Sequence, residues 1–427
     1  MRKVGLFFLL SATGTLSVWG QKVTIDAEIR PRVEYRQGFS KPLADTLQAA
    51  AVTLQRTRLG FAYESNMLDA KVTLQDARVF GETDTKSPSS IGLYEAWAEV
   101  LLLPGTSLKL GRQGVQFEDG RLFSLSPWSN TGNAHDLGQL KLNISGFESQ
   151  TGVAYGNKSA VNYESVYDVS KMYKSLLFFH ASKSIANGLT ISVLGVDEGF
   201  QKGITADLLK ETQHRYTTGG TISLNHDSIP LTFLATAYYQ FGKGNYPGAT
   251  SYVDLKAYLL AIKAQYKLNK TFSLIAGADY YSGSDKATIT ANTATNTFNK
   301  LPYGVNHAFN GCMEYWATLP KGGLVNYFGG LNGKITADLN LEATYYQFHL
   351  AETMMQGTSE IPSDIGSELD VVLNYKLSPE TSLQAGWCTY FSTKGTDMLK
   401  AQTNVAKQFP QFAYLMLTLK PKLFTQK

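Results

Sequence analysis

The sequence predicts an all-β fold, a transmembrane antiparallel up-and-down β-barrel of about 18 strands, with 16 as the alternative count. Three observations support this fold. A short apolar leader precedes a chain without another long apolar run, long segments alternate polar and apolar side chains, and short connections alternate with long ones. A chain that crosses a bilayer without apolar helices crosses it as strands, because only a closed barrel then satisfies the backbone polar groups in lipid.

Residues 1–20 have the features of a signal peptide. Arg2 and Lys3 precede an apolar run that is too short to span a bilayer as a helix. We expect cleavage near Gln21, which leaves residues 21–427 as a β-barrel in the outer membrane of a Gram-negative cell. Loss of the leader lowers the formal net charge from +4 to +2 (4 − 2), and this balance does not indicate a nucleic-acid partner.

The composition agrees with membrane strands. The chain has 24 Tyr, 22 Phe and 38 Gly but only 13 Pro, which suits strands with aromatic girdles and glycine-bearing turns. The two cysteines, Cys312 and Cys388, show no metal or redox spacing and are too few for a framework of disulfides.

The clearest strand runs from Lys22 to Tyr35 and alternates side chains with period two. In a barrel its polar face meets a water-filled lumen and its apolar face meets lipid. Its length favours a barrel, because about 9 to 11 residues cross the hydrocarbon as a tilted strand, whereas strands of soluble proteins have a mode of about 5 to 6 residues. The pattern returns from Ser367 to Lys376.

Short and long connections alternate along the chain, as tight periplasmic turns and extended outer loops do in a barrel. With both termini periplasmic, eight turns and nine loops require 18 strands. The largest expected loops span 116–146, 282–324 and 392–411. The eight expected tight turns are Glu64–Asn66, Pro104–Ser107, Gly156–Ser159, Ser184–Gly188, His226–Pro230, Lys267–Lys270, Thr336–Leu339 and Leu377–Glu380.

Two further segments, Leu140–Ile144 and Ala308–Trp316, resemble strands but would break the up-and-down order. We therefore assign both to loops. The loop that holds Gly120–Gly146 is then long enough to fold inward and narrow a pore, and a surface excursion fits its length equally well.

Arginine is concentrated in the first part of the chain. The period-two pattern directs Arg30 and Arg32 inward from the first strand, Arg56 and Arg58 from the second, and Arg78 from the third. Neighbouring strands lie about 4.8 Å apart, so these side chains form a ladder on one side of the lumen. Eight of the ten arginines belong to this part: Arg30, Arg32, Arg36, Arg56, Arg58, Arg78, Arg112 and Arg121.

Two interpretations of the ladder remain open. Guanidinium groups offer bidentate donors to carboxylate or phosphate and keep their charge, which suits passing anions. Alternatively, the arginines pair with acids and simply fill the lumen, and the two roles overlap because facing charges orient polar solutes. The acids on these strands are Asp26, Glu28, Glu34, Asp76, Glu95 and Glu99.

Catalysis has less support. Three lumen aromatic residues could stack on sugar rings or could be packing or girdle residues, and we favour packing or girdle roles for them: Trp97, Tyr281 and Tyr346. The six histidines have no metal-ligand spacing, and no G-x-S-x-G elbow occurs. His135 with Asp136, or His307, are weak candidates for a catalytic base. We expect no enzyme activity, no metal and no cofactor.

The segment Gly111–Leu137, GRQGVQFEDGRLFSLSPWSNTGNAHDL, resembles the alginate-export porin family of outer-membrane barrels. Shorter similarities are QDARVFG at 75–81, YYQFGKG at 238–244, SGSD at 282–285 and HAFNG at 307–311. The resemblance implies a monomeric barrel of 18 strands with an arginine-lined, anion-selective pathway for an acidic polysaccharide. The chain departs from the family in its second half, where arginine is rare and the acids Asp279, Glu342, Glu368 and Asp370 face the lumen.

We therefore expect a porin that contacts outer-membrane lipid and lets anionic or polar solutes, including acidic oligosaccharides or polysaccharides, diffuse or be exported. The alternatives are a scaffold that binds a surface partner through its long outer loops and an outer-membrane enzyme. The expected pathway residues are Arg30, Arg32, Arg56, Arg58, Arg78, Arg112, Arg121, Glu95 and Glu99.

Overall fold

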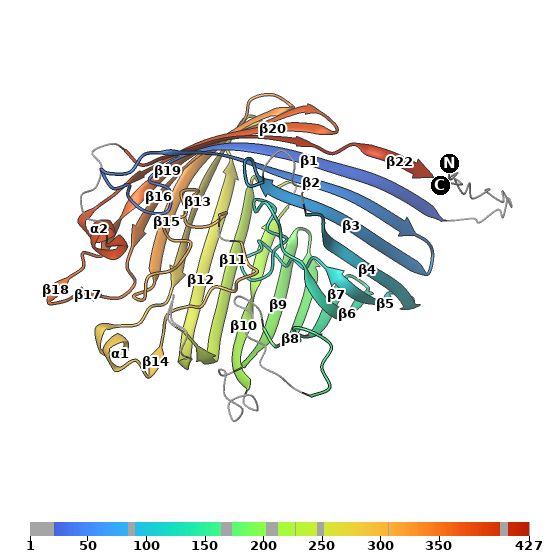
Figure 1. Ribbon diagram of the computed structural model, residues 1–427, viewed down its shortest axis with the longest axis horizontal. Helices are drawn as coiled ribbons and strands as arrows, with labels where there is room; N and C mark the ends of the chain where they lie inside the picture. The colour runs from blue at the N-terminus through green and yellow to red at the C-terminus, as the bar shows by residue number, and fades with distance from the viewer. Residues whose placement is uncertain are drawn as a thin grey trace, which may run out of the picture.

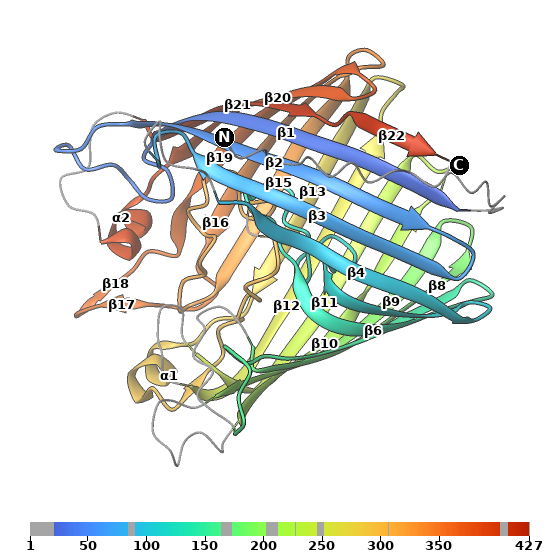
Figure 2. The same ribbon diagram turned by 45° about the vertical axis from the view of Figure 1, so that its right-hand side comes forward.

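The structure is a computed structural model that describes residues 21–83, 90–163, 173–201, 212–226, 228–245, 252–305, 307–401 and 409–426. These residues form a closed antiparallel β-barrel of 18 strands (Figures 1 and 2). The expected signal peptide, residues 1–20, lies outside the described residues. Among the described residues, no helix has the length and apolar character needed to cross a membrane.

The wall follows the order of the chain. Its first half consists of β1 (Lys22–Gln37), β2 (Ala50–Glu64), β3 (Leu68–Val79), β4 (Gly92–Leu103), β5 (Thr106–Gln113), β6 (His135–Ile144), β7 (Phe147–Tyr155), β8 (Ser175–Ala186) and β9 (Leu189–Gln201). Its second half consists of β10 (Thr212–Asn225), β11 (Leu231–Gly244), β12 (Val253–Lys267), β13 (Phe272–Tyr281), β15 (Leu324–Lys334), β16 (Leu339–His349), β19 (Asp364–Ser378), β20 (Thr381–Phe391), β21 (Gln411–Leu419) and β22 (Lys422–Gln426).

The barrel closes where both ends of the chain meet. β1 pairs with β2 on one side, and on the other it pairs first with β21 and then with β22. β21 and β22 are therefore two halves of the eighteenth wall strand. The remaining short elements belong to loops: α1 (Lys286–Ala291), β14 (Ala294–Thr295), β17 (Met355–Gln356), β18 (Ser359–Glu360) and α2 (Lys394–Lys400).

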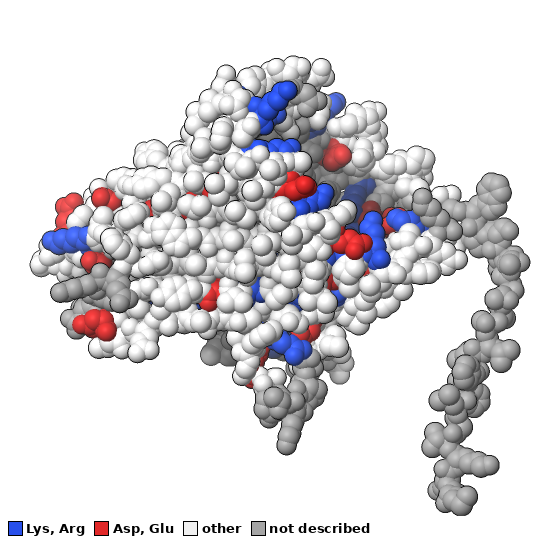
Figure 3. Space-filling view, turned by 90° about the horizontal axis from the view of Figure 1, so that it is seen from above, with Lys and Arg blue, Asp and Glu red and all other residues white. Residues whose placement is uncertain are grey.

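One face of the sheet points into the lumen, and the other face points outward. Arg30 of β1 lies in register with Arg56 of β2, so both side chains share the lumen face. The intervening residues point outward, and Ile29 and Val33 are 40% and 50% exposed. Broad areas of the visible wall carry no charge in Figure 3. This confirms the alternation expected for the first strand.

One tight turn and one loop assignment were wrong. Leu140–Ile144 belongs to β6, which turns into β7 at Ser145 and Gly146, whereas Gly156–Ser159 begins the long connection to β8. Ser145 and Gly146 both have positive φ angles, 51° and 75°, as a two-residue hairpin turn of type I′ requires. The two errors cancel, so the expected strand number, eight turns and nine loops are confirmed. Ala308–Trp316 lies in a loop as expected.

Two long loops fill the barrel. We call the β5–β6 connection, residues 114–134, L3 and the β13–β15 connection, residues 282–323, L7. Aromatic residues of both loops are buried against the inner wall. Examples are Phe123 of L3 and Trp316 of L7, which are 0% and 2% exposed. L3 therefore folds into the barrel. The sequence had left both this course and an excursion over the surface open.

We predict that Val371→Arg hinders barrel assembly strongly, whereas Asn374→Arg on the same strand does not. Val371 shares the outward face with Trp387, and Asn374 lines a lumen cavity with Gln384. A lipid-facing Arg costs about 2 to 4 kcal/mol near the midplane, whereas a lumen Arg stays in water. The measurement is the heat-modifiable gel shift of membrane-inserted protein, and equal shifts for both variants would contradict the face assignment.

Candidate functional site

The arginine ladder binds the backbone of L3. Arg30, Arg32 and Arg56 are each 4% exposed, and their guanidinium groups point at the carbonyl groups of the segment 127–131. Arg30 donates to the carbonyl oxygens of Pro127 and, at 2.8 Å, Ser129. Further hydrogen bonds of the ladder to this segment include Arg32 to Trp128 O at 2.6 Å, Arg56 to Ser129 O at 3.0 Å, and Arg58 to Thr131 O at 3.0 Å.

Carboxylates compensate only part of this charge. Glu28 lies 2.6 Å from Arg56, and Glu34 lies 2.6 Å from Arg32 and 2.5 Å from Arg36. The loop half of β1 and β2 therefore holds five arginines against two glutamates, a local excess of three positive charges (5 − 2). Carbonyl groups stabilise the guanidinium ions as dipoles but leave their net charge in place. The lumen wall here remains electropositive.

Trp128 of L3 connects the ladder to L7. The Arg32 guanidinium lies 3.8 Å from the centroid of the Trp128 ring, and His307 of L7 stacks on that ring at 3.9 Å. His307 is also 3.1 Å from a carboxylate oxygen of Glu314. This stack closes the gap between the two loops next to β1. Sequence analysis missed it, because only the fold brings these residues together.

Arg121 fastens L3 to the β13 side of the wall. Its guanidinium lies 2.8 Å from Asp119 and 2.7 Å from Asp279, and it donates to the Tyr281 hydroxyl at 3.0 Å. Burial works against the charge, but Asp279, Tyr281 and Asp119 outweigh it and raise the pKa of Arg121. The group is thus a permanently charged, fully engaged anchor.

A second buried cation stands nearby in L7. Burial, assisted by the charge of Arg121, lowers the pKa of Lys300 to about 8. Its ammonium group donates to the carbonyl of Ala317 at 3.1 Å. Deprotonation above this pKa removes one positive charge from the loop region.

Two acids of the second half of the chain, Glu368 and Asp370, bind L7. Glu368 accepts a hydrogen bond from the Met313 amide at 2.7 Å, and Asp370 accepts one from the Cys312 amide at 3.0 Å. Aromatic residues add to this contact, since Tyr315 stacks on Tyr390 with ring centroids 3.7 Å apart. Acidic residues stand here instead of arginines because they accept hydrogen bonds from backbone N–H groups of L7.

Cavities remain between the loops and the wall. One of 610 Å³ lies against β1, and its lining includes Arg32, Arg36, Trp128 and His307. A second, of 220 Å³, shares Asp119 and Ala308 with the first. A third cavity, of 430 Å³, opens at the turn end. Its charged lining residues are Lys334, Asp338 and Lys376.

Two of the expected pathway arginines face outward instead. Arg78 lies in register with Gln55, on the face opposite to Arg56, and pairs with Asp76 at 2.7 Å. Arg112 lies in register with Asp136, which it contacts at 2.9 Å. The inward orientation expected for Arg78 is therefore wrong, and neither side chain joins the ladder.

The remaining expected groups occupy the inner wall. Glu95 and Glu99 of β4 face inward and pair with Lys71 at 2.9 Å and Lys141 at 2.8 Å. Trp97 lies beneath the Lys109 ammonium at 3.6 Å. Tyr281 is 2% exposed and packs in the core. Tyr346 also packs against the core, so packing is the interpretation that the structure favours for these two tyrosines.

The weak catalytic candidates each contact other side chains, and His135 and Asp136 point to opposite faces of the wall. His135 faces inward and bonds Tyr173 at 2.9 Å, whereas the adjacent Asp136 faces outward to Arg112. His307 is engaged by Glu314 and Trp128. These contacts are structural.

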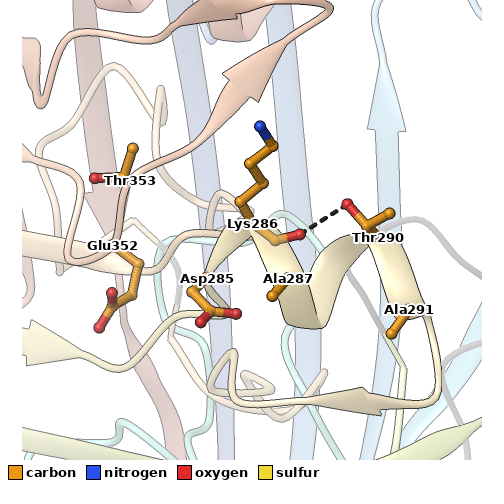
Figure 4. Close-up of a pocket in the computed structure, with 7 residues that line it drawn as sticks. All are labelled: Asp285, Lys286, Ala287, Thr290, Ala291, Glu352 and Thr353. Atoms are coloured by element: carbon orange, nitrogen blue, oxygen red, sulfur yellow. Dashed lines mark hydrogen bonds between the residues drawn. The ribbon is translucent and has the colours of Figure 1, made fainter.

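A separate hollow of 760 Å³ lies on the long loops (Figure 4). Asp285 caps α1 there by accepting the Thr288 amide hydrogen bond at 2.8 Å. The carboxylate of Glu352 faces the same hollow from the β16–β19 loop (Figure 4). None of its lining residues belongs to the arginine ladder, so the hollow is a feature of the loop surface.

Comparison with known proteins places the chain among outer-membrane barrels. The family described as alginate export matches residues 21–406. Pseudomonas aeruginosa OpdL superposes with a TM-score of 0.62 at 14% identity, covering 94% of this chain and 99% of that chain. Pseudomonas aeruginosa OccK9 (OpdG) gives 0.61 at 13%, with 94% and 98% covered.

The outer membrane protein OprD from Pseudomonas aeruginosa gives a TM-score of 0.57 at 12% identity, with 94% of each chain covered. Such identities establish a shared fold. No protein with a curated description matches the chain.

We predict that Arg30→Met loosens L3, because this arginine donates only to carbonyl groups of that loop in the described structure. A hydrogen bond to a charged group contributes about 1.5 to 3 kcal/mol, so amide hydrogen exchange in L3 should accelerate at least about tenfold. Mass spectrometry of detergent-solubilised protein measures the rate. Arg78→Met is the matched control on the outward face, and equal acceleration in both variants would contradict the grip on L3.

Proposed function

Because this chain belongs to the alginate export family and folds as an outer-membrane barrel of porin type, we propose that it is a passive channel for anionic and polar solutes, acidic oligosaccharides among them. The observation that carries this proposal is the excess of arginine over glutamate beside the 610 Å³ cavity. The family is described by export, which is transport rather than a reaction.

The size of the cavity supports small solutes or single extended chains. A volume of 610 Å³ lies within the range of about 300 to 1,000 Å³ typical of small-molecule sites. L3 and L7 occupy the rest of the lumen on this side with buried aromatic side chains. A solute that passes here therefore moves close to the wall of β1 and to the charges on it.

Electrostatics supports the sign of the preferred solute. Arg36 lines this cavity and pairs with Glu34, which is also shared by Arg32. One carboxylate for two guanidinium groups leaves a positive surface at β1, because the other two carboxylates of the cavity lining, Asp119 and Glu314, pair with Arg121 and His307. Within a Debye length of about 8 Å at physiological salt, that surface attracts carboxylate or phosphate groups, and guanidinium groups bind such anions in bidentate fashion.

The same arginines serve two purposes in this proposal. Arg30, Arg56 and Arg58 give their hydrogen bonds to L3, so they contribute charge but few free donors. Within the described part of the chain, Arg36 contacts Glu34 and Phe39 rather than L3, and its side chain is 35% exposed. Arg36 is therefore the residue of this group best placed to meet a solute directly.

We predict that Arg36→Glu shifts the ion preference of the channel from chloride toward potassium. The substitution changes the local charge by two units beside a confined cavity, whereas Arg78→Glu makes the same change on the outward face. The measurement is the zero-current potential of purified protein in a planar bilayer under a KCl gradient. The wild type should favour chloride modestly, and the shift should appear in Arg36→Glu alone.

Cation preference in the wild type would contradict the proposal. Equal potentials for Arg36→Glu and the wild type would show that this cavity does not lie on the conducting path.

A further inference from the structure

Two thiols that are distant in the sequence meet at the inner wall. Cys312 lies in L7 and Cys388 in β20, 76 positions later (388 − 312). Their sulfur atoms and a carboxylate oxygen of Asp370 all lie within 4.8 Å of one another. Cys388 is 0% exposed and lies in register with Asp370 of β19. The segment of L7 around Cys312, which we call the tip of L7, therefore places one thiol next to another that belongs to the wall.

Contacts that do not involve sulfur keep Cys312 next to Cys388. The Cys312 amide donates to Asp370, and the next amide, that of Met313, donates to Glu368. Beyond them, the Trp316 indole donates to the Tyr390 hydroxyl at 3.0 Å. The backbone on both sides of Cys312 is thus fixed against β19 and β20, and the proximity of the thiols is a property of the fold.

We propose that Cys312 and Cys388 form a disulfide bond that fastens the tip of L7 to the barrel wall. The protein resides in the outer membrane, so the chain folds in a compartment where disulfides form and persist. The sulfur atoms already lie within 4.8 Å of each other, and bond formation shortens this distance to about 2.05 Å.

The bond requires an oxidant, and a periplasmic dithiol–disulfide exchange protein is the chemical class that supplies it. The Cys312 thiolate attacks the disulfide of that protein, and one of its sulfur atoms leaves as a thiolate. The Cys388 thiolate then attacks the mixed disulfide and expels the second sulfur atom. Two protons and two electrons leave the chain, and the exchange protein is reduced to a dithiol. Because Cys388 is buried in the finished barrel, the exchange takes place before L7 packs.

A divalent metal ion is the competing occupant of this cluster. Two thiolates and one carboxylate are a suitable set of ligands for zinc. However, Asp370 already accepts the Cys312 amide hydrogen bond with one oxygen, and the compartment favours oxidation of neighbouring thiols. The observations therefore favour the disulfide, and zinc binding is an outcome of the test.

The bond has a consequence for the lumen. It closes a covalent loop that contains β15 to β19, so the tip of L7 stays in the barrel unless the bond is broken. Formation of the bond does not depend on the proposed solute passage. Only its effect on conduction rests on that proposal.

The test counts free thiols in the full-length protein from outer membranes. Cells are quenched by lysis in denaturant that contains excess N-ethylmaleimide, which blocks every free thiol whether buried or exposed in the fold, and the purified, denatured protein is then treated with a polyethylene-glycol maleimide before and after reduction. We expect no mass tag on unreduced protein after the quench and two tags after reduction. Cys388→Ser, in which Cys312 has no partner, should be blocked completely by the quench and show none after reduction.

Absence of tags after reduction of the wild type would overturn the proposal, because it means that both thiols were free when quenched. If tags are absent after reduction and protein purified without N-ethylmaleimide contains one equivalent of zinc, the cluster is a metal site instead. Heat-modifiable gel shifts confirm that each variant forms a barrel, and the wild-type result stands even where Cys388→Ser does not fold.

A second measurement tests the tether. The Cys312→Ser, Cys388→Ser double variant should open more often, with a mean bilayer conductance at least about twofold above that of the bridged wild type. Equal conductance in both proteins would overturn the tether as a restraint on L7, whereas absence of conduction in both would contradict the proposed channel function.

Discussion

The structure depends on charged wall residues that hold the backbone of loops inside a barrel. On β1 and β2, guanidinium groups donate to carbonyl oxygens of L3. On β19, carboxylates accept from amide groups of L7. Hydrogen bonds to charged groups are roughly twice as strong as neutral ones. They also satisfy loop backbone groups that would otherwise be costly to bury. Positively charged wall residues therefore bind loop carbonyl groups, and negatively charged ones bind loop amide groups. The cavities are the part of the lumen that the two loops do not occupy.

This arrangement explains the unequal distribution of charge along the chain. Arginine is concentrated where L3 approaches the wall, and the buried acids Glu368 and Asp370 stand where L7 approaches it. A carbonyl group leaves the arginine charge uncancelled, so the grip on L3 also sets the electrostatic potential of the neighbouring cavity. Under the proposed channel function, the same side chains hold the loops and set the selectivity, which joins the two roles that the arginine pattern had suggested separately.

The sequence predicted most of the barrel because alternation and turn residues act locally. The face of β1 and the number of strands were confirmed. The β6 error arose because the hairpin at Ser145 and Gly146 has only two residues. The orientation of Arg78 depends on the register of β3 against β2, and a slip of one residue moves every side chain to the other face. The contacts of Trp128 with His307 and of Cys312 with Cys388 join distant segments, which no local pattern indicates.

The most direct test of the central claim is the entry of size-matched sugars into liposomes that contain the purified protein. An acidic disaccharide and a neutral disaccharide of equal size should be compared at low and high salt. The account predicts that the acidic sugar enters severalfold faster at low salt and that this advantage shrinks as salt screens the arginines. Equal entry of both sugars at low salt, or faster entry of the neutral one, would contradict the account.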